Sequence, residues 1–173
     1  RPTVRHNFSG WQSPSVMDSV FFDRSKQGIS GHYFIPHPGA YVELRGQKNY
    51  ASRLDTCEHA SIFFYNKGEV TLSASVNKGE PQTETFPPTG ELREMDVTGH
   101  IGSVRWKVES ADSTLFYGLA MDGTQGIIVD NFSLRGSSGL SLRSVPVWMM
   151  REFNEQRPYD LIILQYGLNV ATE

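Results

Sequence analysis

The chain has 173 residues, of which 38% are hydrophobic and 20% charged, and its formal net charge is −3 at pH 7. This composition is ordinary for a globular protein, and a weakly acidic chain with scattered lysines and arginines offers no electrostatic case for binding nucleic acid. No apolar run approaches the roughly 20 residues that a membrane helix needs, so we expect no membrane span. The single cysteine, Cys57, excludes an internal disulfide. A lone cysteine is more often a buried small hydrophobe than a nucleophile.

The chain begins with Arg1 rather than Met, and no charged-then-apolar leader pattern opens it. We therefore expect an interior piece of a longer protein.

Short extended runs alternate with turn residues between about residues 30 and 120. One run alternates apolar and polar side chains at a period of two, which places one face of a strand on a core and the other in water. Its apolar members are Val70, Leu72, Ala74 and Val76. Val104, Trp106 and Val108 alternate in the same way, so we expect Trp106 to lie in the core.

A small internal repeat flanks the first of these runs. The tetrapeptide Asn-Lys-Gly-Glu occurs at residues 66–69 and again at residues 77–80. Each copy supplies a glycine able to take a positive φ where a hairpin turns. The pattern predicts three successive antiparallel strands, over about 60–65, 69–76 and 82–86.

Leu115–Met121 is a further candidate strand, whereas Pro87–Gly90 must be a loop because its two prolines remove hydrogen-bond donors that a sheet would need. Many short strands at this spacing predict an antiparallel β-sandwich or jelly roll.

The pattern changes after Gly126. Segments 127–133 and 160–166 are predicted as strands, each leading to a glycine turn. Between them, Ser144 is placed to cap a helix that ends near Pro158. Apolar side chains recur in this segment at helical spacing, at Val145, Trp148, Met149 and Phe153. The fold class predicted for the chain is therefore mostly β, a sandwich followed by a C-terminal βαβ fragment.

Two short motifs carry a resemblance to a known family. Residues 129–138 read Val-Asp-Asn-Phe-Ser-Leu-Arg-Gly-Ser-Ser, and residues 166–169 read Tyr-Gly-Leu-Asn. They resemble the second and third conserved blocks of the SGNH (GDSL-type) hydrolases. Together with Val4–Asn7 and Trp11–Gln12, they resemble the peptidoglycan O-acetylesterases. In those enzymes a β-sandwich similar to a family-35 carbohydrate-binding module is inserted between the first two blocks.

The resemblance implies three parts of the chain. Residues 1–25 would follow the first catalytic block, residues 26–126 would form the inserted β-sandwich, and residues 127–173 would be a partial SGNH hydrolase domain. It also implies a bacterial protein located in the periplasm or at the cell surface. The truncated hydrolase sheet would leave unpaired edges, so we expect it to dock on the sandwich or to self-associate.

The same resemblance assigns catalytic roles to two residues. SGNH enzymes cleave esters by serine acyl transfer, in which a histidine moves the proton and an aspartate orients the histidine. The backbone N–H of Gly136 and the side-chain amide of Asn169 match the family's oxyanion donors. Each also has a plainer interpretation: Gly136 can serve only as a turn residue, and Asn169 can cap a following helix.

The nucleophile block and the Asp-x-x-His block of the family are missing from the chain. The nearest approach to Gly-Asp-Ser is Met17-Asp18-Ser19, and none of the eight aspartates has a histidine three positions later. We therefore expect the nucleophile and the Asp–His pair to lie outside these 173 residues, and the chain alone not to hydrolyse esters. The five histidines show no metal-ligand spacing, so we expect no metal and no other cofactor.

Sugar binding by the β domain would use exposed aromatic side chains, and Tyr41 and Tyr50, near glycines and charged residues, are the candidates. Three hypotheses for the function therefore stand together. The chain is the middle of a hydrolase acting on an acetylated glycan or another ester, a carbohydrate-binding module without chemistry, or a structural insertion that mediates contacts between domains.

Overall fold

The computed structural model describes residues 2–18, 20–49 and 55–166. The chain forms two compact units, each made of two stretches of sequence. Unit 1 comprises Arg1–Gln12 and Phe34–Val129, and unit 2 comprises Ser13–Tyr33 and Asp130–Glu173. The segment 1–25 is thus divided between the units. Its assignment, and that of 26–126 and 127–173, to parts of a hydrolase stays a prediction.

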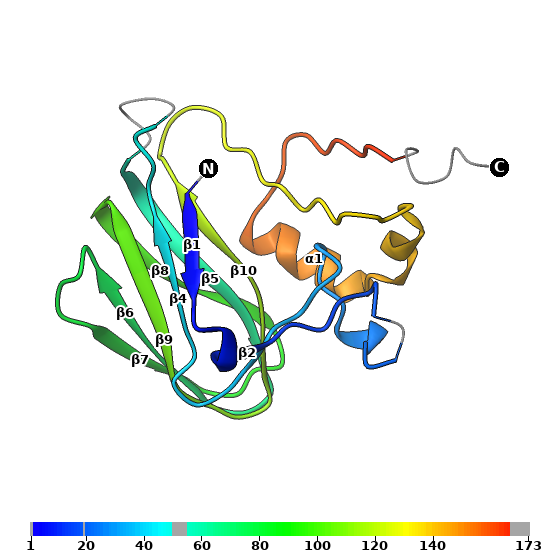
Figure 1. The fold of residues 1–173 in the computed structure, drawn as a ribbon, viewed down its shortest axis with the longest axis horizontal. Coiled ribbons are helices and arrows are strands. Elements are labelled where there is room, and N and C mark those ends of the chain that lie inside the picture. Colours follow the sequence, from blue (N-terminus) through cyan, green and yellow to red (C-terminus); the bar gives the residue numbers. More distant parts are fainter. Residues whose placement is uncertain (1, 19, 50–54, 167–173) are drawn as a thin grey trace. The chain divides into compact units, whose positions relative to one another are not determined.

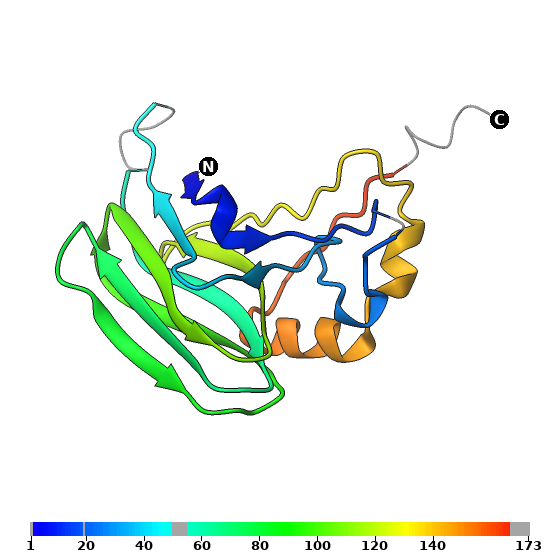
Figure 2. The ribbon, with the colours of Figure 1, turned by 60° about the horizontal axis from the view of Figure 1, so that its bottom comes forward.

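Unit 1 is an antiparallel β-sandwich. Its strands are β1 (Thr3–His6), β2 (Trp11–Gln12), β3 (Ile35–Pro36), β4 (Tyr41–Arg45), β5 (Cys57–Asn66), β6 (Val70–Val76), β7 (Gln82–Phe86), β8 (Leu92–Ile101), β9 (Ser103–Ala111) and β10 (Thr114–Asp122). A five-stranded sheet has the order β1-β4-β9-β6-β7, a three-stranded sheet has the order β10-β5-β8, and β2 pairs with β3. Figures 1 and 2 show the two larger sheets as facing layers. The predicted mostly-β, antiparallel fold is confirmed.

The core of unit 1 lies between the two larger sheets. Along β9 the side chains of Val104, Trp106 and Val108 are buried while their neighbours are more exposed, as the alternating pattern predicts. Phe64 on β5 packs edge-on against Phe86 of β7 at 5.0 Å between ring centroids. The apolar face of each sheet therefore provides half of one continuous core.

The strand pairing differs from the predicted run of three successive antiparallel strands. β5, β6 and β7 occupy the three predicted stretches, and β6 and β7 form the expected hairpin. β5, however, pairs with β8 and β10 in the opposite sheet, and β6 pairs with β9. An alternating pattern predicts which face of a strand is buried. It does not predict which strand lies next to it, because pairing is set by residues distant in sequence.

The glycines of the two Asn-Lys-Gly-Glu repeats do not have the positive φ values that were predicted for them. The positive φ values fall on Asn77 (51°) and Lys78 (63°), and neither Gly68 nor Gly79 has one. Two successive left-handed residues are the geometry of a type I′ hairpin turn. Gly68 serves another purpose, since a Cβ there would lie 2.5 Å from the side chain of Asp112.

Unit 2 contains the 3-10 helices η2 (Arg24–Lys26) and η3 (Leu140–Ser144) and the helix α1 (Val147–Gln156). The predicted helix is confirmed: it buries Met149 and Phe153 and ends before Pro158. Its cap is different, because Ser144 belongs to η3 and the N-cap position is Pro146, which makes no side-chain cap bond. The Ser144 hydroxyl instead accepts a hydrogen bond from Arg24 Nη1 at 2.8 Å.

The structure gives no strand at 127–133 or at 160–166. A strand exists only where its backbone pairs with a neighbour, and no ladder joins either segment to another part of the described chain. Of the expected βαβ fragment, the structure therefore contains the helix, flanked by two unpaired stretches. No helix in the described ranges has the length and apolar character needed to cross a membrane.

Candidate functional site

The turn that contains Gly136 is the first element of the candidate site. Leu134 O accepts a hydrogen bond from Ser137 N at 3.3 Å, and Gly136 has a φ of +81°. L residues with a side chain rarely adopt this conformation, so the turn explains the glycine. Within the described parts of the chain, the N–H of Gly136 has no acceptor, which leaves it able to donate to a bound group.

A second stretch of unit 2 approaches this turn through the side chain of Met17. A Cβ on Gly136 would lie 3.5 Å from Met17 Cε, which is ordinary van der Waals contact. A Cβ on Gly31 would lie 2.8 Å from Leu134 Cδ2. The two sequence stretches of unit 2, Ser13–Tyr33 and Asp130–Glu173, are thus packed together around Gly31 and Gly136.

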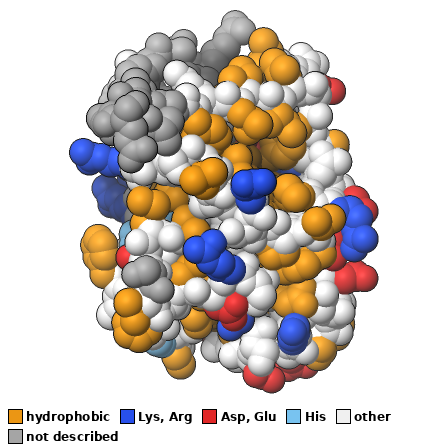
Figure 3. Space-filling view, turned by 90° about the vertical axis from the view of Figure 1, so that its right-hand side faces the viewer, with side chains coloured by type: hydrophobic (Ala, Val, Ile, Leu, Met, Phe, Trp, Pro, Cys, Tyr) orange, Lys and Arg blue, Asp and Glu red, His pale blue; other side chains and the backbone are white. Residues whose placement is uncertain are grey.

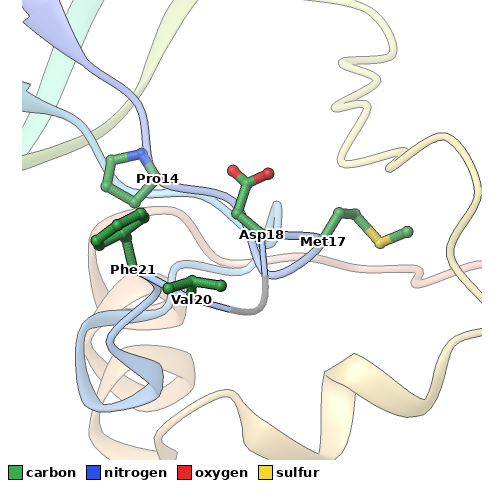
Figure 4. A pocket seen from close by; sticks show the side chains of 5 residues that line it. All are labelled: Pro14, Met17, Asp18, Val20 and Phe21. Carbon is green, nitrogen blue, oxygen red and sulfur yellow. The ribbon is translucent and has the colours of Figure 1, made fainter.

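Met17 and four neighbouring residues also line a pocket of about 440 Å³. Its lining residues are Pro14, Met17, Asp18, Val20 and Phe21, four of which are apolar. Figure 4 shows the rings of Pro14 and Phe21 at one side, the Met17 side chain at the other, and the Asp18 carboxylate between them. This pocket was not predicted from the sequence. The sequence feature that could have indicated it is an acidic residue, Asp18, close to two aromatic residues, Phe21 and Phe22, in a segment without an amphipathic pattern.

A hydrogen-bonded network joins the start of the second block to the end of α1. Arg157 donates to Asp130 from Nε and, at 2.9 Å, from Nη2, and the Tyr159 hydroxyl donates to Asp130 Oδ2 at 2.7 Å. Burial opposes the charge on Asp130, but the hydrogen bonds from Arg157 and Tyr159 outweigh it and lower its pKa. Burial, together with the Asp130 charge, raises the pKa of Tyr159. The network therefore joins Asp130, six residues before Gly136 in the sequence, to the residues that follow α1.

The outer face of the five-stranded sheet holds Tyr41. Its ring lies under the guanidinium of Arg105, 4.8 Å from Cζ to the ring centroid. Glu43 accepts from Arg105 Nε at 3.0 Å and from Nη2 at 2.8 Å, and from Arg45 Nη2 at 3.0 Å. Burial raises the pKa of Glu43, yet its bonds and charge pairing with the two arginines bring it below its usual value. One face of the Tyr41 ring is therefore already occupied.

The predicted site residues do not all fall where the structure describes them. Gly136 lies in unit 2 and Tyr41 in unit 1, while Asn169 and Tyr50 lie outside the described residues. The proximity of Gly136 to Asn169 and that of Tyr41 to Tyr50 therefore stay predictions. No group of three or more potential metal ligands occurs within the described ranges.

Two nucleophilic side chains in unit 1 are held in unreactive settings. Burial raises the pKa of Cys57 to about 11, and its Sγ donates to His59 O at 3.1 Å. Ser61 Oγ donates to Asp96 Oδ1 at 3.0 Å, and His59 Nδ1 lies 3.7 Å from Asp96 Oδ2. The serine thus bonds to the carboxylate and not to the histidine, so this cluster lacks the serine-to-base contact of a catalytic triad.

Comparisons with known proteins give similarity in structure only. No protein-family model and no curated protein sequence matches the chain. Among solved structures, a peptidoglycan O-acetylesterase is similar with a TM-score of 0.58 and 16% identity, over 88% of this chain and 39% of that one. This chain therefore spans well under half of that protein, and the likeness shows a shared fold.

Two further structures from Clostridium thermocellum are similar at lower TM-scores. A family 35 carbohydrate-binding module matches with a TM-score of 0.40 and 15% identity, over 65% of this chain and 98% of that one. A family two carbohydrate esterase in complex with cellohexaose matches with a TM-score of 0.38 and 20% identity, over 65% of this chain and 31% of that one.

Proposed function

We propose that this chain is part of an SGNH-type serine esterase that removes acyl groups from an acetylated carbohydrate such as peptidoglycan. The observation that carries the proposal is the fold shared with a peptidoglycan O-acetylesterase over 88% of the chain. Unit 1 makes up less than two thirds of the chain, so a match of that extent also includes residues of unit 2. Unit 2 contains the segments whose sequences resemble the second and third SGNH blocks.

The chain's contribution to the reaction is the oxyanion hole. When a serine attacks an ester carbonyl, negative charge develops on the former carbonyl oxygen, and preorganised N–H donors stabilise that charge. The N–H of Gly136 is without an acceptor in the described structure, and its left-handed turn fixes its direction. Asn169 would offer side-chain N–H donors beside it.

The remaining catalytic groups are assigned outside this sequence. The chain contains no Gly-Asp-Ser and no Asp-x-x-His, so the proposal places the nucleophile, the general base and its orienting aspartate in other parts of a longer protein. It also places that protein in the periplasm or outside the cell, where glycans carrying acetyl esters are found.

Kinetics of the longer protein that contains this chain test the proposal. Replacing Asn169 by Ala removes one oxyanion donor, which lowers kcat by about 10²–10³-fold with little change in KM. The matched control is Asn154→Ala, because Asn154 is exposed on α1. An unchanged kcat in Asn169→Ala, or serine-dependent hydrolysis of 4-nitrophenyl acetate by the 173-residue chain alone, contradicts the proposal.

A second candidate function is glycan binding by the sandwich without chemistry. The observation in its favour is the polar outer face of the five-stranded sheet, where the half-exposed Tyr41 ring lies beside the Arg105–Glu43 pair. Tyr50 is the second residue proposed for this role. If this function holds, Tyr41→Ala weakens binding of a soluble oligosaccharide in a calorimetric titration, and Tyr33→Phe, a change within unit 2, does not.

A further inference from the structure

The pocket lined by Pro14, Met17, Asp18, Val20 and Phe21 offers the combination of groups that recognises a sugar ring. We propose that it is the subsite for one neutral saccharide unit of the substrate, so that the glycan is held by unit 2 and not by the sandwich. The inference rests on the proposed function for the identity of the substrate as a glycan.

The apolar residues that line the pocket would contact the apolar face of the sugar ring. Met17, Val20 and Phe21 are all exposed, and Phe21 is 86% exposed. Exposed apolar side chains gathered around one hollow mark a binding surface more than scattered ones do. One face of a pyranose ring presents C–H groups, and contact with an aromatic ring removes both surfaces from water.

The Asp18 carboxylate would accept hydrogen bonds from the sugar hydroxyls. Its Oδ2 accepts from the backbone N of Ser15 at 3.2 Å, while Oδ1 has no partner in the described structure. A carboxylate oxygen with free lone pairs accepts hydrogen bonds from hydroxyls and cannot donate when ionised. The pocket therefore favours sugars rich in hydroxyl and N–H groups, and the charge of Asp18 disfavours a uronate carboxylate at the same place.

Backbone hydrogen bonds hold one side of the pocket, residues 15–18, before any ligand arrives. Val16 N donates to Gly31 O at 2.9 Å, Asp18 N donates to Ser15 O at 2.8 Å, and Met17 N donates to Ser15 Oγ at 3.2 Å. These bonds fix the turn on which Met17 and Asp18 are carried. Because the turn is already ordered, less conformational entropy is lost on binding.

The position of Met17 links this pocket to the candidate oxyanion donor. Its Cε lies 3.5 Å from the position that a Cβ on Gly136 would occupy, so Met17 lines the pocket and also faces the open side of the Gly136 turn. A sugar bound against Phe21 and Asp18 would place its ester substituents beside the Met17 side chain. The subsite would thereby position the acyl group near the Gly136 N–H.

Titration of the 173-residue chain with N-acetylchitotetraose by NMR tests the subsite directly. We expect shift changes at the lining residues and about tenfold weaker binding in two variants. Phe21→Ala removes the apolar contact with the sugar ring, and Asp18→Asn removes the charge that strengthens the hydrogen bonds from the sugar hydroxyls. The matched control is Phe8→Ala, since Phe8 is also 86% exposed but belongs to unit 1. It should bind within twofold of the unchanged chain.

Each outcome bears on the subsite separately from the esterase proposal. Loss of binding in Tyr41→Ala with retention in Phe21→Ala, or no binding by the unchanged chain at millimolar ligand, overturns the subsite. Loss in Phe21→Ala with full retention in Asp18→Asn also overturns it, because the proposed subsite requires the Asp18 carboxylate to accept hydrogen bonds from the sugar. If the subsite variants lose binding while Asn169→Ala keeps its kcat, the subsite stands and the oxyanion assignment fails.

Discussion

Gly136 illustrates how one residue can be required by local geometry before any chemistry is considered. Its φ of +81° lies in the left-handed region, and a Cβ added there would meet only the flexible end of Met17 at 3.5 Å. Space is therefore available, and backbone strain is what excludes other residues.

Replacing Gly136 by Ala should lower the free energy of unfolding by about 1–2 kcal/mol, the cost of a left-handed conformation for a residue with a Cβ. Urea unfolding of the 173-residue chain measures it. Gly118→Ala is the control, because Gly118 has no positive φ and no atom within 4 Å of its added Cβ. Equal losses in the two variants would show that the turn does not impose the strain.

The Cys57 thiol should react slowly. Burial raises its pKa to about 11 from an ordinary value near 8.5, so at pH 8 its thiolate fraction is about two orders of magnitude lower than in the unfolded chain. Because the folded pKa is raised, the stabilisation that this shift reflects is complete below pH 8.5 and is lost as pH rises through 11. Alkylation by iodoacetamide, followed by mass spectrometry, checks the rate. Equal rates in the folded chain and in urea would contradict it.

At the scale of elements, the network of Asp130, Arg157 and Tyr159 joins the segment before the Gly136 turn to the end of α1. The side chains of Asp130 and Arg157 are only 20% and 15% exposed. Removing one partner of such a pair leaves a partly buried charge without its hydrogen bonds. Phe132 adds an edge-on contact with Phe153 at 5.8 Å between centroids. Polar and aromatic contacts thus hold the same two elements together.

Asp130→Asn should destabilise the chain by about 1–3 kcal/mol at pH 7, because the charge-assisted bonds to Arg157 are lost. The pKa of Asp130 is lowered on folding, so its stabilisation is complete above the unfolded value near 3.9 and disappears as pH falls through the folded pKa. The difference in urea midpoint between the variant and the unchanged chain should therefore shrink below about pH 4.

Glu109→Gln provides the comparison for that experiment, because Glu109 pairs with Lys107 on the exposed face of β9. An exposed pair of this kind contributes about 0–1 kcal/mol. If the two variants lose equal stability at pH 7, the network around Asp130 has no special role.

The elements that were predicted well are those with a simple local pattern. β6 and β9 alternate cleanly, and α1 has apolar side chains on one face and a proline after its end. β8 was not predicted, because Arg93 and Glu94 separate Leu92 from Met95 and obscure the period of two. Segments 127–133 and 160–166 have the composition of buried strands, but strand formation depends on a neighbour that composition does not reveal.

On the scale of the whole molecule, these two unpaired segments leave apolar side chains in water. Ile127, Val129, Leu161 and Ile163 are all exposed, between 75% and 93%. Their extended backbones have no ladder partners in the described ranges. Figure 3 shows hydrophobic side chains at several places on one face of the molecule, beside lysines and arginines. Such segments pair readily with other extended chains.

We therefore expect the 173-residue chain to self-associate at concentrations of about 100 µM, on the basis of the apolar surface that extended chains bury when they pair. Sedimentation velocity should show a shift to monomer when Leu161 and Ile163 are both replaced by Lys. Thr83→Lys, an exposed change on β7, is the control and should leave association unchanged. A monodisperse unchanged chain at that concentration would remove the basis for this expectation.

The sequence by itself determined the antiparallel sandwich, the helix before Pro158, the burial of Trp106 and the glycine turn at 136. Each depends on the partition of side chains between water and core, or on backbone sterics, within a few residues of chain. Only the tertiary structure decided which sheet contains β5, that Arg105 covers Tyr41, and that Met17 faces the Gly136 turn. Those contacts join residues far apart in sequence, and no local pattern records which distant surfaces will meet.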